Sequence, residues 1–370
     1  MVIQWQPGIR YGLLKIIYFS PISSPTFPVY ILLIMAKKQT IYDVARVANV
    51  AISTVSRVLN DSPYVSYETK KRVQRAIDEL DFRPQVNARK LARREAQIIA
   101  VALPTFTTPF FNEILKGVKD RIKETDLDFI IYNTGSDNPE QTLKTFLDRG
   151  IPDALLILSI DLDPATQKRL HNAQIPIVLV GIKEKDFNYI YWNNYKGGYM
   201  AGEFLIKQGY KKIGMVRSHS KSSVADSREK GFRDVLAKYN LLLDENFFVK
   251  GITRKHAGYS EEAGYESIQI MKERGGLPEA IFCTNDAQAI GVIHALKELK
   301  LRVPEDVAVM GYDNIKTAHY LGLTTIDQSM YDVGVMAIDR LIDMIKNKDT
   351  SLIQKEIEPK LAIRDTTRKV

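Results

Sequence analysis

The stretch TIYDVARVANVAISTVSRVLN, residues 40–60, contains two helical periods separated by a short break. In the first period, apolar side chains recur at the spacing of one helix face, at Ile41, Val44, Ala45 and Ala48. After the break, Val55 and Leu59 form a second apolar face, and hydroxyl side chains and Arg57 lie on the other side. Two short helices joined by a tight turn are typical of a helix-turn-helix, whose second helix enters the major groove of DNA. A helical hairpin with no DNA partner has the same periodicity, so the pattern alone leaves that alternative open.

Positive charge is concentrated around this stretch. The chain has a formal net charge of +8, and residues 36–97 hold 13 Lys and Arg against 7 Asp and Glu. Residues 98–370 hold 37 residues of each sign and are therefore neutral. A solvated basic face would give the same count, but the coincidence with the helix-turn-helix pattern favours a role in neutralising DNA phosphates.

Cysteine and histidine usage excludes several classes of site. The single cysteine, Cys283, rules out internal disulfides and cysteine-rich zinc sites and suits a reducing cytosol. The five histidines are scattered without metal-ligand spacing, so no metal or cofactor is predicted. Ser218–Lys221 fits a Ser-x-x-Lys nucleophile pattern, which is common by chance, and the glycines at 197, 198 and 202 lack the spacing of a dinucleotide site. We therefore predict that the chain is not an enzyme.

The N-terminal part divides into three predicted segments. Residues 1–36 mix prolines with apolar runs that are shorter than the roughly 18 to 20 residues of a membrane-spanning helix. We interpret them as an extension before a natural start at Met35, with a signal peptide or a membrane anchor as alternatives. Residues 37–83 are the predicted DNA-binding domain, in which Thr40 and Ser66 can cap helices. Residues 84–97 form a basic connector.

From residue 98 onward the pattern changes to short apolar runs that alternate with amphipathic helical stretches such as 111–123. The predicted strands are Ile98–Leu103, Phe129–Tyr132, Ala154–Leu158, Ile177–Val180, Lys212–Val216, Ala280–Cys283 and Val307–Gly311. This alternation indicates parallel sheets covered by helices on both faces, and the length suggests two such lobes in residues 98–370. A small molecule is expected to bind between the lobes, at the carboxyl ends of their strands.

These segments together resemble the lactose-repressor (LacI/GalR) family of bacterial transcription regulators over residues 38–367. Stretches that carry the resemblance include the helix-turn-helix, VSYETKKRVQRAIDELDFRPQVNARKLA, NNYKGGYMAGEFLIKQGYKKIGMV, AIFCTNDAQAIG, LRVPEDVAVMGYDNI and LTTIDQSM. The resemblance implies a homodimer with an all-α headpiece, a hinge helix and an α/β core of two doubly wound lobes like a periplasmic sugar-binding protein. It also implies that an effector bound in the core changes the affinity for a near-palindromic operator.

The resemblance assigns DNA contacts in two segments. On the recognition helix, the operator-discriminating pair falls on Ile52 and Ser53, followed by Thr54, and Arg57 could hold a guanine or a phosphate. Candidate phosphate contacts are Thr40, Ser56 and Asn60, for which a helix cap or plain solvent exposure is the alternative. The hinge-helix pattern matches Asn87, Ala88, Arg89 and Leu91. In the family the leucine wedges into the minor groove; packing of Leu91 on the core is the alternative.

The family positions that line the effector site fall on Phe110, Phe111, Arg228, Asn285, Asp286 and Asp313, and Trp192 is a further candidate. Aromatic rings stack on a sugar or base, and charged side chains bind hydroxyls or ring nitrogens. One of the two phenylalanines could instead be core, Asp286 or Asp313 could be caps, and Trp192 could be packing. Asn193-Asn194 departs from the Asp-Asn of many relatives. Residues 252–262 form a long loop, either solvated or facing the cleft mouth to favour an acidic ligand.

The predicted function is therefore a cytoplasmic, effector-controlled repressor. Carbohydrates are the effectors that the resemblance favours, with purines and nucleosides as the alternative. An exported solute-binding protein would explain the core but not the basic residues 40–94. A membrane-tethered regulator would follow if the chain started at Met1. The sequence leaves open whether the effector releases or promotes DNA binding, and it favours a dimer because no leucine heptads follow residue 366.

Overall fold

The computed structural model describes residues 39–59, 62–82, 98–135, 137–150, 152–220, 222–241 and 244–367. The chain divides into two compact units, with the boundary between Glu95 and Ala96. The predicted extension and hinge helix lie outside the described residues, so their boundaries remain predictions.

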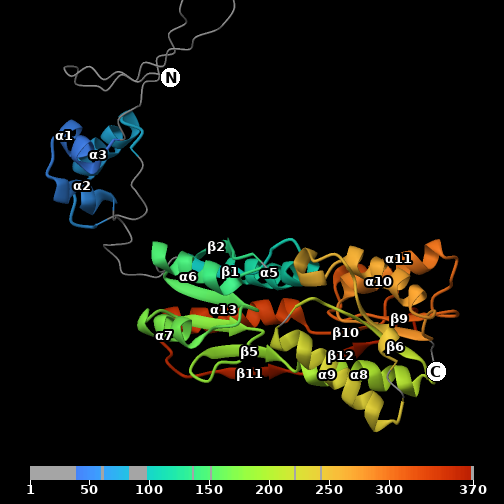
Figure 1. Cartoon of the computed structure of the whole chain (residues 1–370). Helices are drawn as coiled ribbons and strands as arrows, with labels where there is room; N and C mark the ends of the chain where they lie inside the picture. The colour runs from blue at the N-terminus through green and yellow to red at the C-terminus, as the bar shows by residue number, and fades with distance from the viewer. Residues whose placement is uncertain are drawn as a thin grey trace, which may run out of the picture. The chain divides into compact units, whose positions relative to one another are not determined.

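The described residues of the first unit form the helices α1 (Ile41–Val47), α2 (Ile52–Leu59) and α3 (Tyr67–Glu79), shown in blue in Figure 1. The turn between α1 and α2 includes Asn49 in the left-handed region at φ 49°. One buried valine from each helix forms the core, at Val44, Val55 and Val73. The helix-turn-helix predicted from the two apolar periods is confirmed.

Both predicted caps of this unit form. The backbone N–H and the hydroxyl of Thr40 donate to the carboxylate of Asp43, at 3.0 and 2.7 Å. The Oγ of Ser66 accepts from the N–H of Thr69 at 3.4 Å. Each cap satisfies polar groups that a helix N-terminus leaves without intrahelical partners.

The second unit begins with a lobe that we call lobe one, built on a six-stranded parallel sheet in the order β11-β5-β4-β3-β1-β2. Its strands are β1 (Ile98–Leu103), β2 (Asp128–Asn133), β3 (Ala154–Leu158), β4 (Ile177–Val180), β5 (Asn188–Trp192) and β11 (Gln354–Ile357). Its helices are α5 (Pro109–Ile122), α6 (Pro139–Arg149), α7 (Pro164–Asn172) and α13 (Met330–Lys346).

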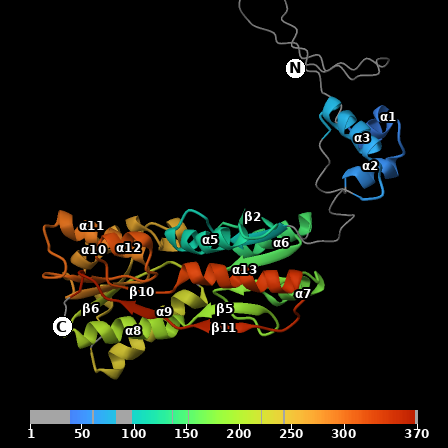
Figure 2. The same ribbon diagram turned by 180° about the vertical axis from the view of Figure 1, so that it is seen from behind.

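The alternation of side chains along the strands explains why helices cover both faces of this sheet. In β1, Ile99 and Val101 share a cluster with residues of α5 and α13, whereas Ala100 and Ala102 share one with α6 and α7. Successive residues of a strand point to opposite faces, and all four are buried. A strand buried on both sides is the mark of a doubly wound sheet. Figure 2 shows α13 lying along α5.

Lobe two is built on a parallel sheet in the order β7-β6-β8-β9. Its strands are β6 (Ile213–Arg217), β7 (Phe248–Lys250), β8 (Ala280–Cys283) and β9 (Ala308–Met310), and β10 (Thr325–Asp327) pairs antiparallel with β12 (Lys360–Ala362). Its helices are α8 (Asn194–Lys207), α9 (Ser223–Lys238), α10 (Glu261–Glu273), α11 (Asp286–Glu298) and α12 (Lys316–Tyr320), with short 3-10 turns η1 (Glu245–Phe247) and η2 (Lys255–Gly258).

Three connections join the lobes. The chain passes from β5 to α8 at Asn193, from β10 to α13 through Gln328 and Ser329, and from β11 to β12 through 358–359. Ser329 has φ 49°, in the left-handed region that side chains other than glycine rarely adopt. Any relative movement of the lobes must change the backbone of these segments. Side-chain contacts to the segments can therefore influence that movement.

The two-lobed α/β prediction is confirmed, and all seven predicted strands are present with ends within one residue. The search for apolar runs missed β5, β7, β10, β11 and β12, which are short or carry polar side chains. Strand β11 reads Gln-Lys-Glu-Ile and is largely exposed, because it lies at the edge of its sheet. Among the described residues, no helix is long and apolar enough to cross a membrane.

Candidate DNA-binding and effector sites

The exposed face of α2 carries the predicted operator contacts. Val55 is fully buried and anchors the helix, while Ser53 and Arg57 are exposed and Ile52 keeps 42% of its surface accessible. An isoleucine left this open next to a serine offers an apolar and a polar contact side by side. That combination suits a thymine methyl group beside a base edge.

The remaining predicted DNA contacts fall into two groups. Thr54 and Ser56 are half-buried on α2, and Thr40 caps α1 while remaining exposed. A capping threonine at an exposed helix N-terminus can still meet a phosphate. The other five predicted residues lie outside the described residues: Asn60, Asn87, Ala88, Arg89 and Leu91.

Arg228 on α9 is the centre of a buried polar cluster in lobe two. It is only 5% exposed, and its Nε donates to Asn194 Oδ1 at 2.9 Å. Its Nη1 donates to the carbonyl oxygen of Thr284 at 2.7 Å, and its Nη2 to Gln328 Oε1 at 3.4 Å. The guanidinium also lies 3.8 Å above the ring centroid of Tyr312, which is the geometry of a cation–π contact.

A glycine explains how Arg228 reaches this position. A Cβ on Gly198 of α8 would lie 2.0 Å from the carbonyl oxygen of Arg228, closer than any real contact. The absence of a side chain lets α8 and α9 pack closely. The sequence pattern of Gly197 and Gly198, which fits no dinucleotide site, therefore has a packing role.

Asp313 lies beside Arg228 and is 3% exposed. Its Oδ1 accepts from Gln328 Nε2 at 2.6 Å and lies 3.7 Å from Arg228 Nη1. Its backbone has φ 119°, and strain of this kind is held where the surroundings fix it, often at functional sites. Burial raises the pKa of Asp313 to about 7, and the guanidinium of Arg228 offsets part of that effect.

Two tyrosine hydroxyls of this cluster are buried without a hydrogen-bond partner among the described residues, those of Tyr312 and Tyr259. A Cβ on Gly197 would lie 2.1 Å from Tyr312 Oη, so the hydroxyl occupies the space of the missing side chain. Burial raises the pKa of Tyr312 to about 12, which keeps the phenol neutral and able to donate. Buried polar groups without partners are costly.

The predicted aromatic residues divide between site and core. Phe111 is packed into the core of lobe one, as the alternative for one of the two phenylalanines anticipated. Phe110 is partly buried, with its ring edge-on to Trp192 at 5.6 Å between centroids. The indole Nε1 of Trp192 donates to the carbonyl oxygen of Gln328 at 2.7 Å, so Trp192 is both packed and linked to the polar cluster.

Asn285 and Asp286 serve the structure of lobe two. Asn285 Oδ1 caps α11 by accepting from the N–H of Gln288 at 2.9 Å. Asp286 is fully buried, and its carboxylate accepts from Thr325 Oγ1 at 2.6 Å and from the N–H of Ile315 at 2.8 Å. Burial raises its pKa well above the ordinary range. The helix cap expected as an alternative for Asp286 is therefore made by Asn285. Asp286 instead connects α11 to β10 and to the residue before α12.

The loop at 252–262 was expected either to be solvated or to face the cleft mouth, and its residues do both. Lys255 is exposed and pairs with Glu262 at 2.8 Å, and Arg254 is exposed. His256, with φ 49°, approaches Thr107 of lobe one, at 3.5 Å between Nε2 and Oγ1. The lysine is thus neutralised by a carboxylate, which gives no support to an acidic ligand.

Sequence reasoning missed several members of the polar cluster. Gln328 and Tyr312 lie within quoted family stretches, but neither stands out by type or spacing. Asn194 was noted only as part of a departure from the family pattern. A buried amide or phenol is indistinguishable in sequence from an exposed one. These residues are recognised as members of the site only because the fold brings the connections between the lobes together.

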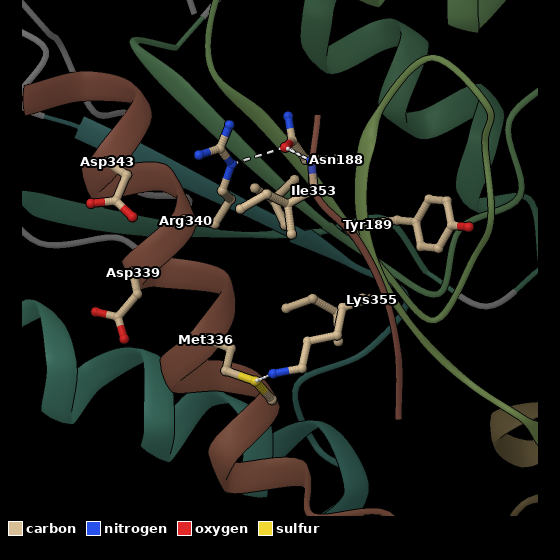
Figure 3. Close-up of a pocket in the computed structure, with 10 residues that line it drawn as sticks. Asn188, Tyr189, Met336, Asp339, Arg340, Asp343, Ile353 and Lys355 are labelled. Atoms are coloured by element: carbon tan, nitrogen blue, oxygen red, sulfur yellow. Dashed lines mark hydrogen bonds between the residues drawn. The ribbon is translucent and has the colours of Figure 1, made fainter. Parts of the chain in front are cut away.

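A separate hollow of about 200 Å³ lies in lobe one between α13 and the strands β5 and β11 (Figure 3). Arg340 on its wall donates to Asn188 Oδ1 at 2.9 Å and to Asp349 at 2.5 Å, and Asp339 pairs with Arg121. The Nζ of Lys355 lies 3.0 Å from Met336 Sδ. These bonds connect α13 to the strands and to the segment that follows it, which is a structural role.

The pKa of Asp313 predicts a pH effect on stability. Its ordinary value is 3.8 and its value in the fold is about 7, so between these pH values the folded chain holds a proton that the unfolded chain has lost. Stability should therefore fall as the pH rises from about 4 to about 7. Urea unfolding of wild type and Asp313→Asn measures this contribution, and parallel pH profiles for the two proteins would contradict it.

A helix-turn-helix unit joined to a two-lobed α/β unit with a buried polar cluster defines a class of protein, the ligand-responsive regulators that bind DNA. Comparison with known proteins identifies the family. Residues 40–85 match "Bacterial regulatory proteins, lacI family", and residues 203–367 match "Periplasmic binding protein-like domain".

Named relatives cover almost the whole chain. The ribose operon repressor of Haemophilus influenzae is 32% identical over 88% of this chain and 98% of the relative. The repressor PurR of Vibrio vulnificus is 31% identical over 90% of this chain and 99% of the relative. The lac repressor dimer bound to operator and the anti-inducer ONPF is similar in structure, with a TM-score of 0.71, 25% identity and coverage of 90% of this chain and 99% of that chain.

The chain therefore belongs to the lacI family of bacterial regulatory proteins. It is a DNA-binding transcriptional repressor and not an enzyme, as the sequence predicted.

Proposed function

We propose that this chain is a cytoplasmic, homodimeric repressor whose affinity for a near-palindromic operator is set by a neutral carbohydrate bound in the core. The observation that carries the proposal is the buried pair of Arg228 and Asp313, whose guanidinium and carboxyl groups lie 3.7 Å apart beside the connection formed by Gln328. A guanidinium that donates and a carboxyl group that accepts match the hydroxyl groups of a sugar, each of which both donates and accepts.

The other proposed effector contacts are Phe110, Trp192 and Asn285, with Phe111 and Asp286 as supporting residues beneath them. Of the edge-on pair, Phe110 is the partly exposed ring that a sugar could contact, and the buried Trp192 holds it in place. The name of the ribose operon repressor agrees with a carbohydrate, and purines remain the alternative.

For DNA, we propose that Ile52, Ser53, Thr54 and Arg57 read the major groove and that Thr40, Ser56 and Asn60 hold phosphates. Leu91 is proposed as the minor-groove wedge, with Asn87, Ala88 and Arg89 beside it on the hinge helix.

A homodimer is supported by the edge of the lobe-one sheet. Strand β2 lies at this edge, and its Ile130 and Ile131 are 45% and 44% exposed. A hollow of about 500 Å³ runs beside them along α5 and α12. An open edge strand with exposed isoleucines favours burial against a second copy. Two-fold symmetry of that pair would match a near-palindromic operator.

A ligand panel read by thermal shift tests the effector class. Aldopentoses, aldohexoses, disaccharides, sugar phosphates, purine bases and nucleosides are added to the full chain. A neutral sugar at about 100 times its Kd should stabilise the core by about 2.7 kcal/mol, which corresponds to a rise in Tm of about 5 °C. Stabilisation by purines alone, or by phosphorylated sugars alone, would contradict the proposal.

A further inference from the structure

Gln328 occupies an unusual position in the second connection between the lobes. It is fully buried, and it lies between β10 of lobe two and α13 of lobe one. Its side chain points into the proposed effector site, while its main chain belongs to the segment on which lobe movement depends.

The carboxamide of Gln328 makes contacts that a sugar would make. Its Nε2 donates to Asp313 Oδ1 at 2.6 Å, and its Oε1 accepts from Arg228 Nη2 at 3.4 Å. A carboxamide therefore supplies one donor to the carboxylate and one acceptor to the guanidinium. Two neighbouring hydroxyl groups supply the same pair.

The bonds around Arg228 differ in length in a way that favours exchange at Gln328. The bonds to Asn194 and to the carbonyl oxygen of Thr284 are 2.9 and 2.7 Å, and both fix the guanidinium. The bond to Gln328 is the longest of the three. A ligand hydroxyl could therefore take the place of the Gln328 oxygen without disturbing the position of Arg228.

Gln328 is also connected to the first link between the lobes. Its carbonyl oxygen accepts from the indole of Trp192, the last residue of β5. Asn194, two residues further on, donates to the carbonyl oxygen of Trp192 at 3.1 Å and accepts from Arg228. Ser329 follows Gln328 with a left-handed backbone, and α13 begins at Met330. A change at the Gln328 side chain would therefore reach both connections.

We propose that the Gln328 carboxamide is a built-in ligand of the effector site, which holds Asp313 and Arg228 until an effector displaces it and thereby changes the connection to α13. This rests on the proposed function, since it assumes that the effector binds Asp313 and Arg228. It adds a competition between the chain and its effector, and it assigns the transmitted movement to one side chain.

The test compares full-length wild type, Gln328→Ala and Gln167→Ala. Gln167 is the matched control, because its carboxamide donates to the carbonyl oxygen of Leu162 within lobe one. The competition predicts that Gln328→Ala binds the sugar selected from the panel at least about threefold more tightly than wild type. Its operator affinity without sugar should shift in the direction in which saturating sugar shifts wild type. Gln167→Ala should match wild type in both measurements.

Weaker sugar binding by Gln328→Ala, with a responsive wild type, would overturn the proposal, because the carboxamide would then contact the bound sugar or only support the fold. A second probe, propionamide, needs no sugar and fits the space that Gln328→Ala vacates. It should raise the Tm of Gln328→Ala and leave wild type unchanged, whereas equal effects on both would overturn the proposal. If no sugar binds wild type, the carbohydrate proposal fails, and propionamide still decides the role of Gln328.

Discussion

Replacing Arg228 with alanine is expected to abolish the response of operator binding to the effector and to weaken effector binding at least about 100-fold. The guanidinium holds Asn194, the carbonyl oxygen of Thr284 and Gln328 in place, and it faces the carboxyl group of Asp313. Its loss removes the main charged donor of the site. It also removes the cation that stabilises the charged form of the buried Asp313 carboxyl group. Calorimetric titration and fluorescence anisotropy on labelled operator measure the two effects.

Because Arg228→Ala can also lower the folded population, Arg228→Lys gives a second measurement. Lysine keeps the charge but not the planar fork of donors, so effector binding should fall while the Tm stays closer to wild type. Arg233→Ala is the matched control on the same helix, where the partly buried arginine pairs with Glu229 and Glu245 and does not contact Asp313. Full effector response in Arg228→Lys would exclude the proposed site.

Replacing Arg57 with alanine is expected to reduce operator affinity about 10- to 100-fold and to reduce the preference for operator over random duplex. Arg57 is exposed on α2, the helix that Val55 anchors in the core of the first unit. An arginine contact to a base edge contributes about 1–3 kcal/mol of discrimination. Anisotropy titrations on operator and on scrambled duplex measure both quantities.

Lys211→Ala is the control for Arg57→Ala, because it removes one exposed positive charge from the second unit. If Arg57→Ala reduced the affinity for operator and for scrambled duplex equally, Arg57 would contact a phosphate instead of a base. Substituting Ile52 and Ser53 together should change the preferred half-site sequence. Neither side chain carries a charge, so their loss should have little effect on binding to phosphates. Thermal unfolding should change little in all of these variants, because the substituted side chains are exposed.

Periodicity predicted the elements whose side chains are strongly sorted by burial. Helices α1, α2 and α3 each bury one valine completely and expose the opposite face, which gives a clear signal over one or two turns. The buried strands of both sheets are continuous apolar runs for the same reason. Edge and hinge strands such as β11 and β10 lack this signal, because one side of each faces solvent or a polar cluster.

The effector site was only partly predictable. Arg228 and Asp313 are charged residues at family positions, and the structure brings them within 3.7 Å of each other. Gln328 and Tyr312 gain their roles from tertiary contacts between segments more than ten residues apart. Asp286 looked equally functional in sequence, but both of its oxygens are used within lobe two. Only the three-dimensional partners of a buried carboxylate distinguish a ligand contact from a structural one.

The central claim is that a small molecule in the core controls sequence-specific binding by the headpiece. The most direct measurement selects genomic fragments with the full-length protein and then titrates the best fragment in the presence and absence of the stabilising sugar. The account predicts a near-palindromic fragment bound at least about 1,000-fold more tightly than random duplex, with an affinity that the sugar changes by at least about tenfold. Equal affinity for the selected fragment and random duplex, with or without any ligand of the panel, would contradict it.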